Sequence, residues 1–397
     1  MAPSTGVLEG IRVLDFGRYI AGPYCGALLA DLGADVIRVE RREGGEDRWV
    51  TPVTPDGVGS MFLQCNRGKR ALTLDPTTAA GREVVARLVA TADVVIANLP
   101  PGTLRTMGLD HETLRAVRAD IITVTATAFG SGGDWSGKVG FDGLAQAASG
   151  HMHLTGPPGA PSRASLPYVD FSTATLAALA TLVALRHRDR TGEGQLIEAA
   201  LLRTALTWNS LTLIEQAVLG VDRTSTHNRS QTAGPADLFR TRDGWVLCSV
   251  IGPTQFRHWA AMVGRPDLVA DPRFVDDPSR GENGEALSAY MGAWCADRTT
   301  AECLAAMEQA RIPGGPVLTP REALDLPHVA QIGVFEQVRY PTAAEAVPLA
   351  RFPVELSGSP GTIQGPPPEL GEHTDEILAE VGYDIAAIGE LRDAGVV

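Results

Sequence analysis

The sequence predicts an α/β protein whose large domain is a doubly wound, Rossmann-like parallel sheet and whose smaller domain is α+β. Through the first 200 residues, short apolar runs alternate with stretches whose apolar residues recur at helical spacing. Near residue 224 this alternation gives way to a polar, turn-rich stretch, DRTSTHNRSQTAGP. We therefore expect the first part of the large domain in residues 1–224 and the small domain in residues 225–330.

The opening of the chain predicts a βαβ unit. IRVLDF (11–16) is a short apolar strand, 21–33 has small and apolar residues at helical spacing, and ADVIRVE (34–40) is a second apolar strand. The alternation then continues, with strands expected at 70–75, 93–99 and 120–129, helices at 81–92, 113–119, around 145–150 and at 171–189, and a further element in 191–201.

The second half of the chain has a different pattern. Residues 236–252 predict two strands around an Arg-Asp-Gly turn, and helices are expected at 255–264 and 302–312. Strand-like texture returns at 347–356. A Pro/Gly-rich linker and a helix close the chain.

Composition and charge narrow the possible partners. The chain has 397 residues and a net charge of −13, which works against binding nucleic acid or anionic membranes. No run approaches the roughly 18 apolar residues of a membrane helix, and the N-terminus does not resemble a signal peptide. The five scattered cysteines form no disulfide or zinc pattern, so we expect a cytoplasmic protein. His151 and His153 form a metal half-site without a carboxylate to complete it, so no metal is expected.

Nucleotide-binding motifs are largely missing. Gly17, Gly22 and Gly26 follow the first strand without making GxGxxG, although Glu40 ends the second strand where a ribose-binding acid would lie. No P-loop, HExxH or GxSxG occurs. The sequence therefore argues against NAD as a cofactor.

Basic side chains gather in three places along the sequence: Arg41–Arg42 with Arg48, Arg67–Lys69–Arg70, and Arg105. Arg41–Arg42 directly follow the second predicted strand, and the segment that begins at Asn98 follows another. Each arginine alone could be a solvated surface residue. However, open α/β sheets bind ligands at the carboxyl ends of their strands, so together these residues predict a phosphorylated ligand along that edge.

Asp170 lies where a strand-like segment, LPYV, meets the start of a long apolar helix. One interpretation is a helix N-cap, in which the carboxylate accepts backbone N–H bonds. The other is a carboxylate directed into the sheet edge, where it could attack an activated acyl group. The pattern alone leaves both open.

A family resemblance favours the second interpretation. LEGIRVLDFGRYIAGPYCGALLADLGADVIRVER (8–41) resembles the opening of the family III CoA-transferases. Further segments match in family order: NRGKRALTLD (66–75), ADVVIANLPPG (92–102), GFDGLAQAASG (140–150), ALRHRDRTGEGQ (184–195), ADLFRTRDGWV (236–246) and LGEHTDEIL (370–378). The resemblance implies that Asp170 is the nucleophile and forms a mixed anhydride and then an aspartyl-CoA thioester.

The same resemblance implies the ligand contacts and the assembly. An acyl-CoA donor and a carboxylic acid acceptor are the expected substrates. CoA would lie near Arg41, Leu74, Asn98, Arg105 and Lys138, with Arg18, Tyr19 and Ile20 at the pantetheine and acyl end. Residues 331–397 would return to the large domain, and two chains would interlock as a homodimer. Side-chain size alone suggests that Tyr19, Trp49, Phe141, Met152 and Tyr168 could shape an acyl pocket or simply pack in the core.

Two departures from the family pattern and two rival functions remain. Thr106 stands where the family often has a basic residue, and no glycine-rich flap is evident around 225–240. Alpha-methylacyl-CoA racemase shares the fold but uses a histidine where this chain has Phe141, and phenylalanine cannot transfer a proton. A noncatalytic CoA-binding protein would bind thioesters without turnover.

Overall fold

The computed structural model describes residues 6–397, and their contacts divide the chain into two compact units. The first unit contains the described chain up to Ser149, residues 165–211 and residues 330–397; the second contains 150–164 and 212–329. The second unit thus begins before the predicted residue 225 and takes in an additional short segment. The polar stretch near residue 224 follows the end of the helix Ser210–Leu219 and does not mark the unit boundary. The additional segment belongs to the second unit, where the Gly156 carbonyl accepts from the Ser225 hydroxyl.

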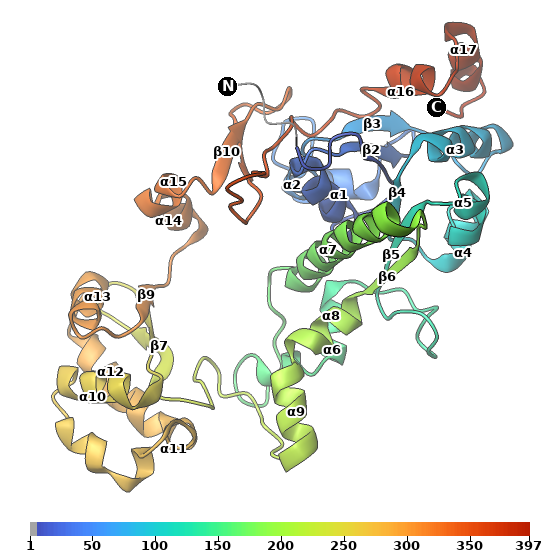
Figure 1. Cartoon of the computed structure of the whole chain (residues 1–397). Helices are drawn as coiled ribbons and strands as arrows, with labels where there is room; N and C mark the ends of the chain where they lie inside the picture. Colours follow the sequence, from blue (N-terminus) through green and yellow to red (C-terminus); the bar gives the residue numbers. More distant parts are fainter. Residues whose placement is uncertain (1–5) are drawn as a thin grey trace. The chain divides into compact units, whose positions relative to one another are not determined.

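A six-stranded parallel sheet forms the centre of the first unit (Figure 1). Its strand order is β3-β2-β1-β4-β5-β6. The strands are β1 (Arg12–Asp15), β2 (Asp35–Glu40), β3 (Arg70–Thr73), β4 (Val94–Ala97), β5 (Ile122–Thr127) and β6 (Leu196–Ala200). This order reverses direction between β1 and β4, as in a doubly wound fold, so the predicted fold class is confirmed.

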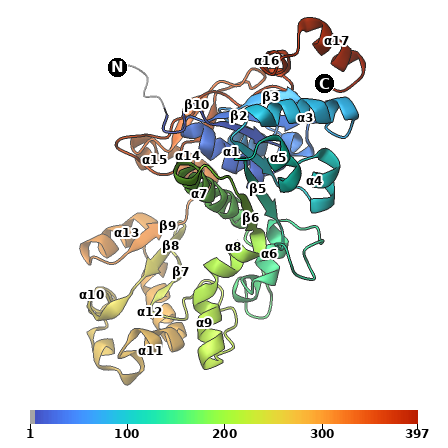
Figure 2. The same cartoon turned by 45° about the vertical axis from the view of Figure 1, so that its right-hand side comes forward.

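Helices cover both faces of this sheet (Figure 2). The helices of this unit are α1 (Ala21–Asp31), α2 (Ser60–Cys65), α3 (Ala79–Thr91), α4 (Pro101–Met107), α5 (His111–Val117), α6 (Asp142–Ala148), α7 (Tyr168–Thr191), α8 (Leu201–Trp208), α16 (Thr374–Glu380) and α17 (Ile385–Asp393); α1 and α7 lie on one face, and α3, α5 and the C-terminal helices lie on the other. Helix α9 (Ser210–Leu219) runs across the boundary between the units. The sequence patterns missed α4, whose Pro-Pro-Gly start resembles a loop.

Alternation along the strands assigns each apolar residue to one of two cores. Val13 and its neighbours in β2 and β4 pack with α1 and α7, whereas Leu14 packs with α3, α5 and the C-terminal helices. Helix α7 is the one described helix that is long and apolar enough to cross a membrane by length and composition. Several of its alanines are buried in the core that it forms with α1.

The LGEHTDEIL motif covers the open edge of the sheet at β3. The His373 backbone N–H donates to the Ala71 carbonyl, and the Ala71 N–H donates back to His373 Nδ1. The Thr73 N–H donates to Thr374 Oγ1 at 3.2 Å. These contacts satisfy backbone groups that an edge strand would otherwise leave exposed. A separate hairpin, β10 (Phe335–Val338) with β11 (Val347–Ala350), packs on α2.

The second unit has its own small core. An antiparallel sheet of β7 (Ala236–Arg240), β8 (Trp245–Ser249) and β9 (Gly314–Pro316) packs against helices around buried Trp259 and Met291. The helices are α10 (Gly252–Met262), α11 (Asp277–Glu282), α12 (Gly284–Ala296) and α13 (Thr300–Gln309). Two short helices without buried residues, α14 (Pro320–Asp325) and α15 (Pro327–Gln331), follow β9, and α15 extends past the end of this unit at Val329. The predicted hairpin around the Arg-Asp-Gly turn is confirmed by β7 and β8.

Candidate active site

A cavity of about 220 Å³ lies at the switch point of the sheet, where the strand order reverses. Its walls come from the loops that follow β1, β4 and β5, and Asp170 reaches it from the first turn of α7. Five of the predicted site residues line this one cavity: Arg18, Tyr19, Asn98, Lys138 and Asp170. The family-implied Ile20 lines it as well.

Asn98 fixes the loop after β1 against the loop after β4. Its Oδ1 accepts from the Arg18 backbone N–H at 2.6 Å, and its Nδ2 donates to the Arg18 carbonyl at 2.7 Å. A Cβ at Gly22 would lie 3.1 Å from Asn98 Oδ1, so glycine allows this approach. Tyr19 has a φ of 60°, a conformation that non-glycine residues seldom adopt. The reciprocal bonds thus hold a strained loop at the cavity wall.

Asp142 binds the N-terminal end of α7. Its Oδ2 accepts from the backbone N–H groups of Val169 at 2.8 Å and Asp170 at 3.1 Å. Asp170 is therefore not the N-cap: α7 starts at Tyr168, Pro167 occupies the N-cap position, and Asp142 satisfies two of the free N–H groups. The cap interpretation of Asp170 is wrong, because another carboxylate performs that role.

Burial raises the pKa of Asp170 to about 7, and the nearby negative charge of Asp142 adds to the effect. Two carboxyl groups with different tasks therefore lie side by side. Asp142 is occupied by N–H donors and by Gln146, whereas Asp170 faces the cavity. A carboxyl group with this pKa can gain or lose its proton near neutral pH.

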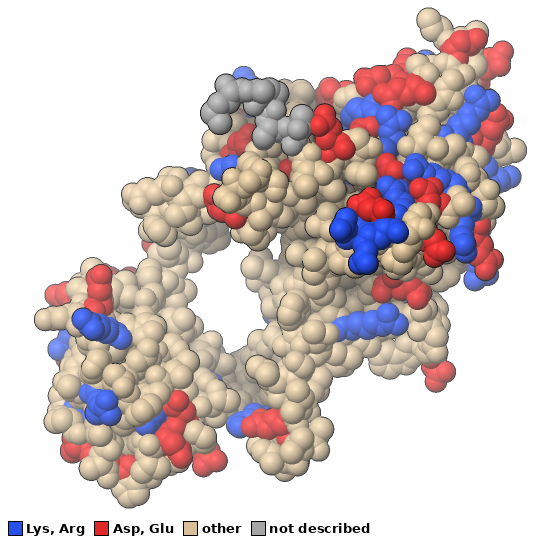
Figure 3. Space-filling model, in the orientation of Figure 1, with Lys and Arg blue, Asp and Glu red and all other residues tan. Residues whose placement is uncertain are grey.

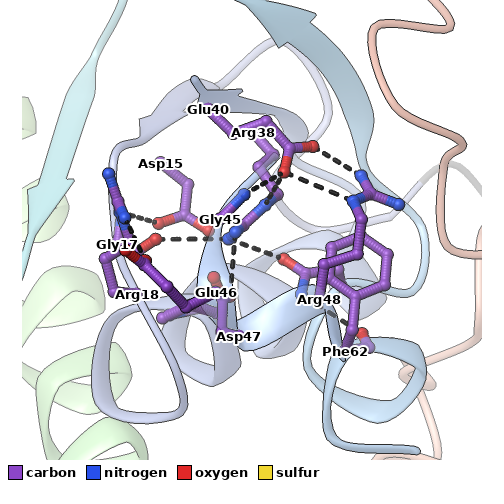
Figure 4. Close-up of polar contacts among 12 residues, drawn as sticks. Asp15, Gly17, Arg18, Arg38, Glu40, Gly45, Glu46, Asp47, Arg48 and Phe62 are labelled. Atoms are coloured by element: carbon purple, nitrogen blue, oxygen red, sulfur yellow. Dashed lines mark hydrogen bonds and ion pairs between the residues drawn. The ribbon is translucent and has the colours of Figure 1, made fainter. Parts of the chain in front are cut away.

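A buried charge network lies beneath the loop after β1 (Figure 4). Arg38 donates to the Gly17 carbonyl and to Asp47, and Glu40 pairs with Arg48, whose guanidinium lies over the Phe62 ring. Lys69 Nζ donates to Asp15 at 2.6 Å, to Pro23 and to Asn66. The six charged members are Asp15, Arg38, Glu40, Asp47, Arg48 and Lys69, three of each sign and each at most 4% exposed.

Part of the predicted phosphate site is wrong, because three of its basic residues are buried in ion pairs. Arg48 and Lys69 are enclosed by acidic partners, and Arg67 is buried in a pair with Asp31, so these three cannot reach a ligand. Burial would raise the pKa of Glu40, but Arg38 and Arg48 outweigh it and hold that pKa below its usual range. Glu40 is therefore a structural anion and not a ribose-binding acid.

The remaining predicted binding residues lie outside the Asp170 cavity. Arg105, in the last turn of α4, lines an adjoining cavity. Leu74 is 1% exposed and packs in the core, which leaves only its backbone for a ligand. Arg41 is exposed and pairs with Glu46 at 2.7 Å, and the same carboxylate binds Arg18 at 2.8 Å. The sequence analysis missed both Glu46 and Asp142.

The suggested acyl-pocket residues are not all together. Tyr19 and Phe141 line the cavity and meet edge to face, with ring centroids 5.5 Å apart. Trp49 is exposed at the end of a short 3-10 helix, η1 (Glu46–Trp49), and Met152 belongs to the second unit. Tyr168 is half-buried and packs beside the site at the start of α7.

Neither the metal-ligand types among the described residues nor the charge on the face drawn in Figure 3 indicates a second site. Among residues 6–397, no three His, Cys, Asp or Glu side chains come together as metal ligands. The five cysteines are buried thiols. On the face drawn in Figure 3, basic side chains lie among acidic ones and form no continuous basic surface.

Comparisons with known proteins identify the family of the chain. A sequence profile of CoA-transferase family III matches residues 8–374. The chain is 36% identical over 394 residues to a succinyl-CoA:mesaconate CoA-transferase of Haloarcula marismortui, covering 96% of this chain and 97% of that one. It is 33% identical over 383 residues to a succinyl-CoA–D-citramalate CoA-transferase of Chloroflexus aurantiacus, covering 94% of each. A solved CAIB/BAIF family protein from Brucella suis superimposes with a TM-score of 0.84 at 32% identity, covering 95% of this chain and all of that one.

Proposed function

The chain belongs to CoA-transferase family III, and from that membership we propose that it moves CoA from an acyl-CoA thioester to a free carboxylic acid through Asp170. The observation that carries the proposal is the position of Asp170: its carboxyl group faces the cavity at the switch point, and its pKa is raised to about 7. A raised pKa makes the ionised carboxylate a stronger nucleophile.

The proposed reaction exchanges one activated acyl bond for another. An Asp170 oxygen attacks the thioester carbonyl, the C–S bond breaks, and CoA leaves as the thiolate. The thiolate then attacks the aspartyl carbonyl of the mixed anhydride, which releases the donor acid and leaves an aspartyl-CoA thioester. The acceptor carboxylate attacks this thioester and forms a new anhydride, releasing thiolate. That thiolate takes the acceptor acyl group and frees Asp170.

Each step replaces one activated acyl bond, a thioester or an anhydride, with another, so the reaction needs no ATP. The nucleophile must be ionised at the start, and a pKa near 7 gives a substantial ionised fraction at neutral pH. Asp142 supports this arrangement by fixing the backbone from which Asp170 projects. Backbone N–H groups would stabilise the successive oxyanions.

The positions of the cavity residues support a proposal for how CoA is bound. Arg18, Tyr19, Asn98 and Lys138 share the cavity with Asp170 and would hold the pantetheine and nearby phosphate groups. Arg41, Arg105 and the Leu74 backbone would bind the nucleotide end. We also propose an interlocked homodimer. A 41.9 kDa monomer at micromolar concentration would contradict it.

Phe141 favours a transferase over a racemase. It lines the cavity in the segment Gly140-Phe141-Asp142, and its ring has no proton to exchange. Asp142 is already bound by two backbone N–H groups and Gln146. The segment Gly140-Phe141-Asp142 therefore offers Asp170 no histidine to act as the second acid–base group of a racemase.

The test is an acyl-exchange assay read by mass spectrometry. Succinyl-CoA and a panel of other acyl-CoA donors are mixed with mesaconate, citramalate, glutarate and aromatic acids. Wild type should form new acyl-CoA, and Asp170→Ala should lose at least about a thousandfold of this activity. Asp189→Ala, an exposed change on the same helix, is the matched control. No exchange across the panel, together with deuterium uptake at the alpha carbon of a 2-methylacyl-CoA, would favour the racemase.

A further inference from the structure

Glu46 joins two arginines that lie on different loops of the site. Its Oε2 is 2.8 Å from Arg18 Nη1, and its Oε1 is 2.7 Å from Arg41 Nη2. Arg18 follows β1 and lines the Asp170 cavity, whereas Arg41 directly follows β2. One carboxylate thus occupies the point on which both guanidinium groups converge.

The backbone of Glu46 is anchored, but its side chain can leave. Glu46 starts η1, and the next two residues, Asp47 and Arg48, are buried in the charge network (Figure 4). The Glu46 side chain itself is 57% exposed, and those of Arg18 and Arg41 are 22% and 49% exposed. Ion pairs this exposed are weak, so a competing anion can open them at little cost.

Ionised Glu46 competes with a phosphate group for the guanidinium groups of Arg18 and Arg41. A bond from its own backbone N–H, and then Arg18 and Arg41, hold its pKa below the usual range although partial burial opposes them, so it is ionised at neutral pH. A phosphate group needs the same guanidinium donors and carries the same sign of charge. Both anions cannot occupy this point together.

We propose that Glu46 is an internal counter-ion, which fills the anion position between Arg18 and Arg41 in the free protein and is displaced by a phosphate group of CoA. This inference rests on the proposed function, because it takes CoA as the ligand. While no ligand is bound, Glu46 forms ion pairs with both arginines and excludes other anions from them. It weakens CoA binding, because part of the binding free energy is spent on breaking these ion pairs.

The opposite role makes the opposite prediction. If Glu46 only orients Arg18 and Arg41 for the ligand, its removal disorders both side chains and weakens CoA binding. The sign of the change in affinity therefore decides between a counter-ion and an orienting residue.

The experiment is calorimetric titration of CoA into wild type, Glu46→Gln, Glu46→Ala and Glu43→Gln. Glu43 is exposed on the same segment, so its variant controls for the loss of one negative charge. We expect both Glu46 variants to bind CoA about three- to fivefold more tightly than wild type, and the control to change by less than about 1.5-fold. Raising NaCl from about 50 mM to about 500 mM should reduce the gain, since salt screens exposed charges.

Two analogues identify which phosphate displaces Glu46. If dephospho-CoA loses the gain, the 3′-phosphate is the competing group; if it keeps the gain, the diphosphate is. Pantetheine has no phosphate, and an equal gain with pantetheine would overturn the assignment.

The remaining outcomes separate this inference from the proposed function. Wild type that binds CoA while the Glu46 variants bind equally or more weakly would overturn the counter-ion role and leave the transferase proposal intact. Absence of CoA binding by every protein, with unfolding temperatures equal to that of wild type, would overturn both.

Discussion

Two groups of buried charge in the first unit follow opposite rules. In the network beneath the loop after β1, three cations balance three anions, and each of the three carboxylates forms an ion pair with a guanidinium or ammonium group. At the start of α7, the charge that acts on Asp170 is that of another carboxylate, Asp142. In the first arrangement opposite charges stabilise one another, whereas in the second burial and a like charge make ionisation of Asp170 costly.

The difference distinguishes charges that stabilise the fold from a carboxyl group that is available for reaction. A paired buried charge holds loops in place and gives up its contact with any ligand, as Arg48 and Lys69 do. A carboxyl group that is buried beside a like charge keeps its reactivity, at the expense of folded-state stability. Basic residues that look alike in the sequence therefore divide into buried pairs and exposed ligand-binding candidates such as Arg41.

The largest expected effect comes from breaking the scaffold network. Lys69→Met removes the ammonium group from Asp15 and leaves that carboxylate buried with only the Gly17 N–H as a donor. Loss of one partner of a buried pair should lower the free energy of unfolding by about 3–5 kcal/mol. Urea unfolding monitored by circular dichroism measures it.

Arg392→Met is the exposed counterpart of this change. Arg392 pairs with Asp375, and both side chains are more than half exposed. Its loss should cost less than about 1 kcal/mol. If the two variants were destabilised equally, burial would not be what makes the network matter.

A smaller effect, with the opposite sign, is expected at Asp170. The folded-state pKa of about 7 exceeds the ordinary aspartate pKa of 3.8, which applies to the unfolded chain, so stability is lost as the pH rises from about 4 to about 7. Asp170→Asn removes this loss. The stability advantage of the variant over wild type should therefore be about 3 kcal/mol larger at pH 8 than at pH 5, at 1.36 kcal/mol per pKa unit over about two units.

Urea unfolding at the two pH values tests this, with Asp189→Asn on the exposed face of α7 as the control. A stabilisation by Asp170→Asn that is the same at pH 5 and pH 8 would mean that Asp170 titrates normally. That result would contradict the raised pKa assigned to Asp170.

Much of the fold could be predicted because local patterns encode it. The buried strands β1, β2, β4 and β5 are short apolar runs, and parallel pairing follows from the helices between them. Helix α4 could not be predicted, since Pro101 and Gly102 open it. The boundary at Thr212 also escaped prediction, because it falls within a continuous helix whose pattern does not change there.

The site was harder to predict where one residue acts on another far along the chain. Asn98 follows a strand in an obvious position, and Asp170 precedes an apolar helix. Asp142, in contrast, caps a helix that starts 26 residues later, so its role depends on tertiary contact alone. Arg48 and Arg41 lie on one basic segment, and only folding shows that the first is enclosed and the second exposed.

The carboxyl pair itself can be tested through the pKa of Asp170. Asp142→Asn keeps an oxygen that can accept from the Val169 and Asp170 N–H groups but removes the negative charge beside Asp170. The pKa of Asp170 should fall, so the acid limb of the pH profile of kcat/KM should move to lower pH. Because burial raises this pKa more than Asp142 does, the movement should be less than half of the raise from 3.8 to about 7, or under about 1.5 units. Exchange rates from pH 5 to pH 9 measure it. An unshifted limb with reduced kcat would mean that Asp142 acts only by fixing the backbone of α7, and that burial alone accounts for the pKa of Asp170.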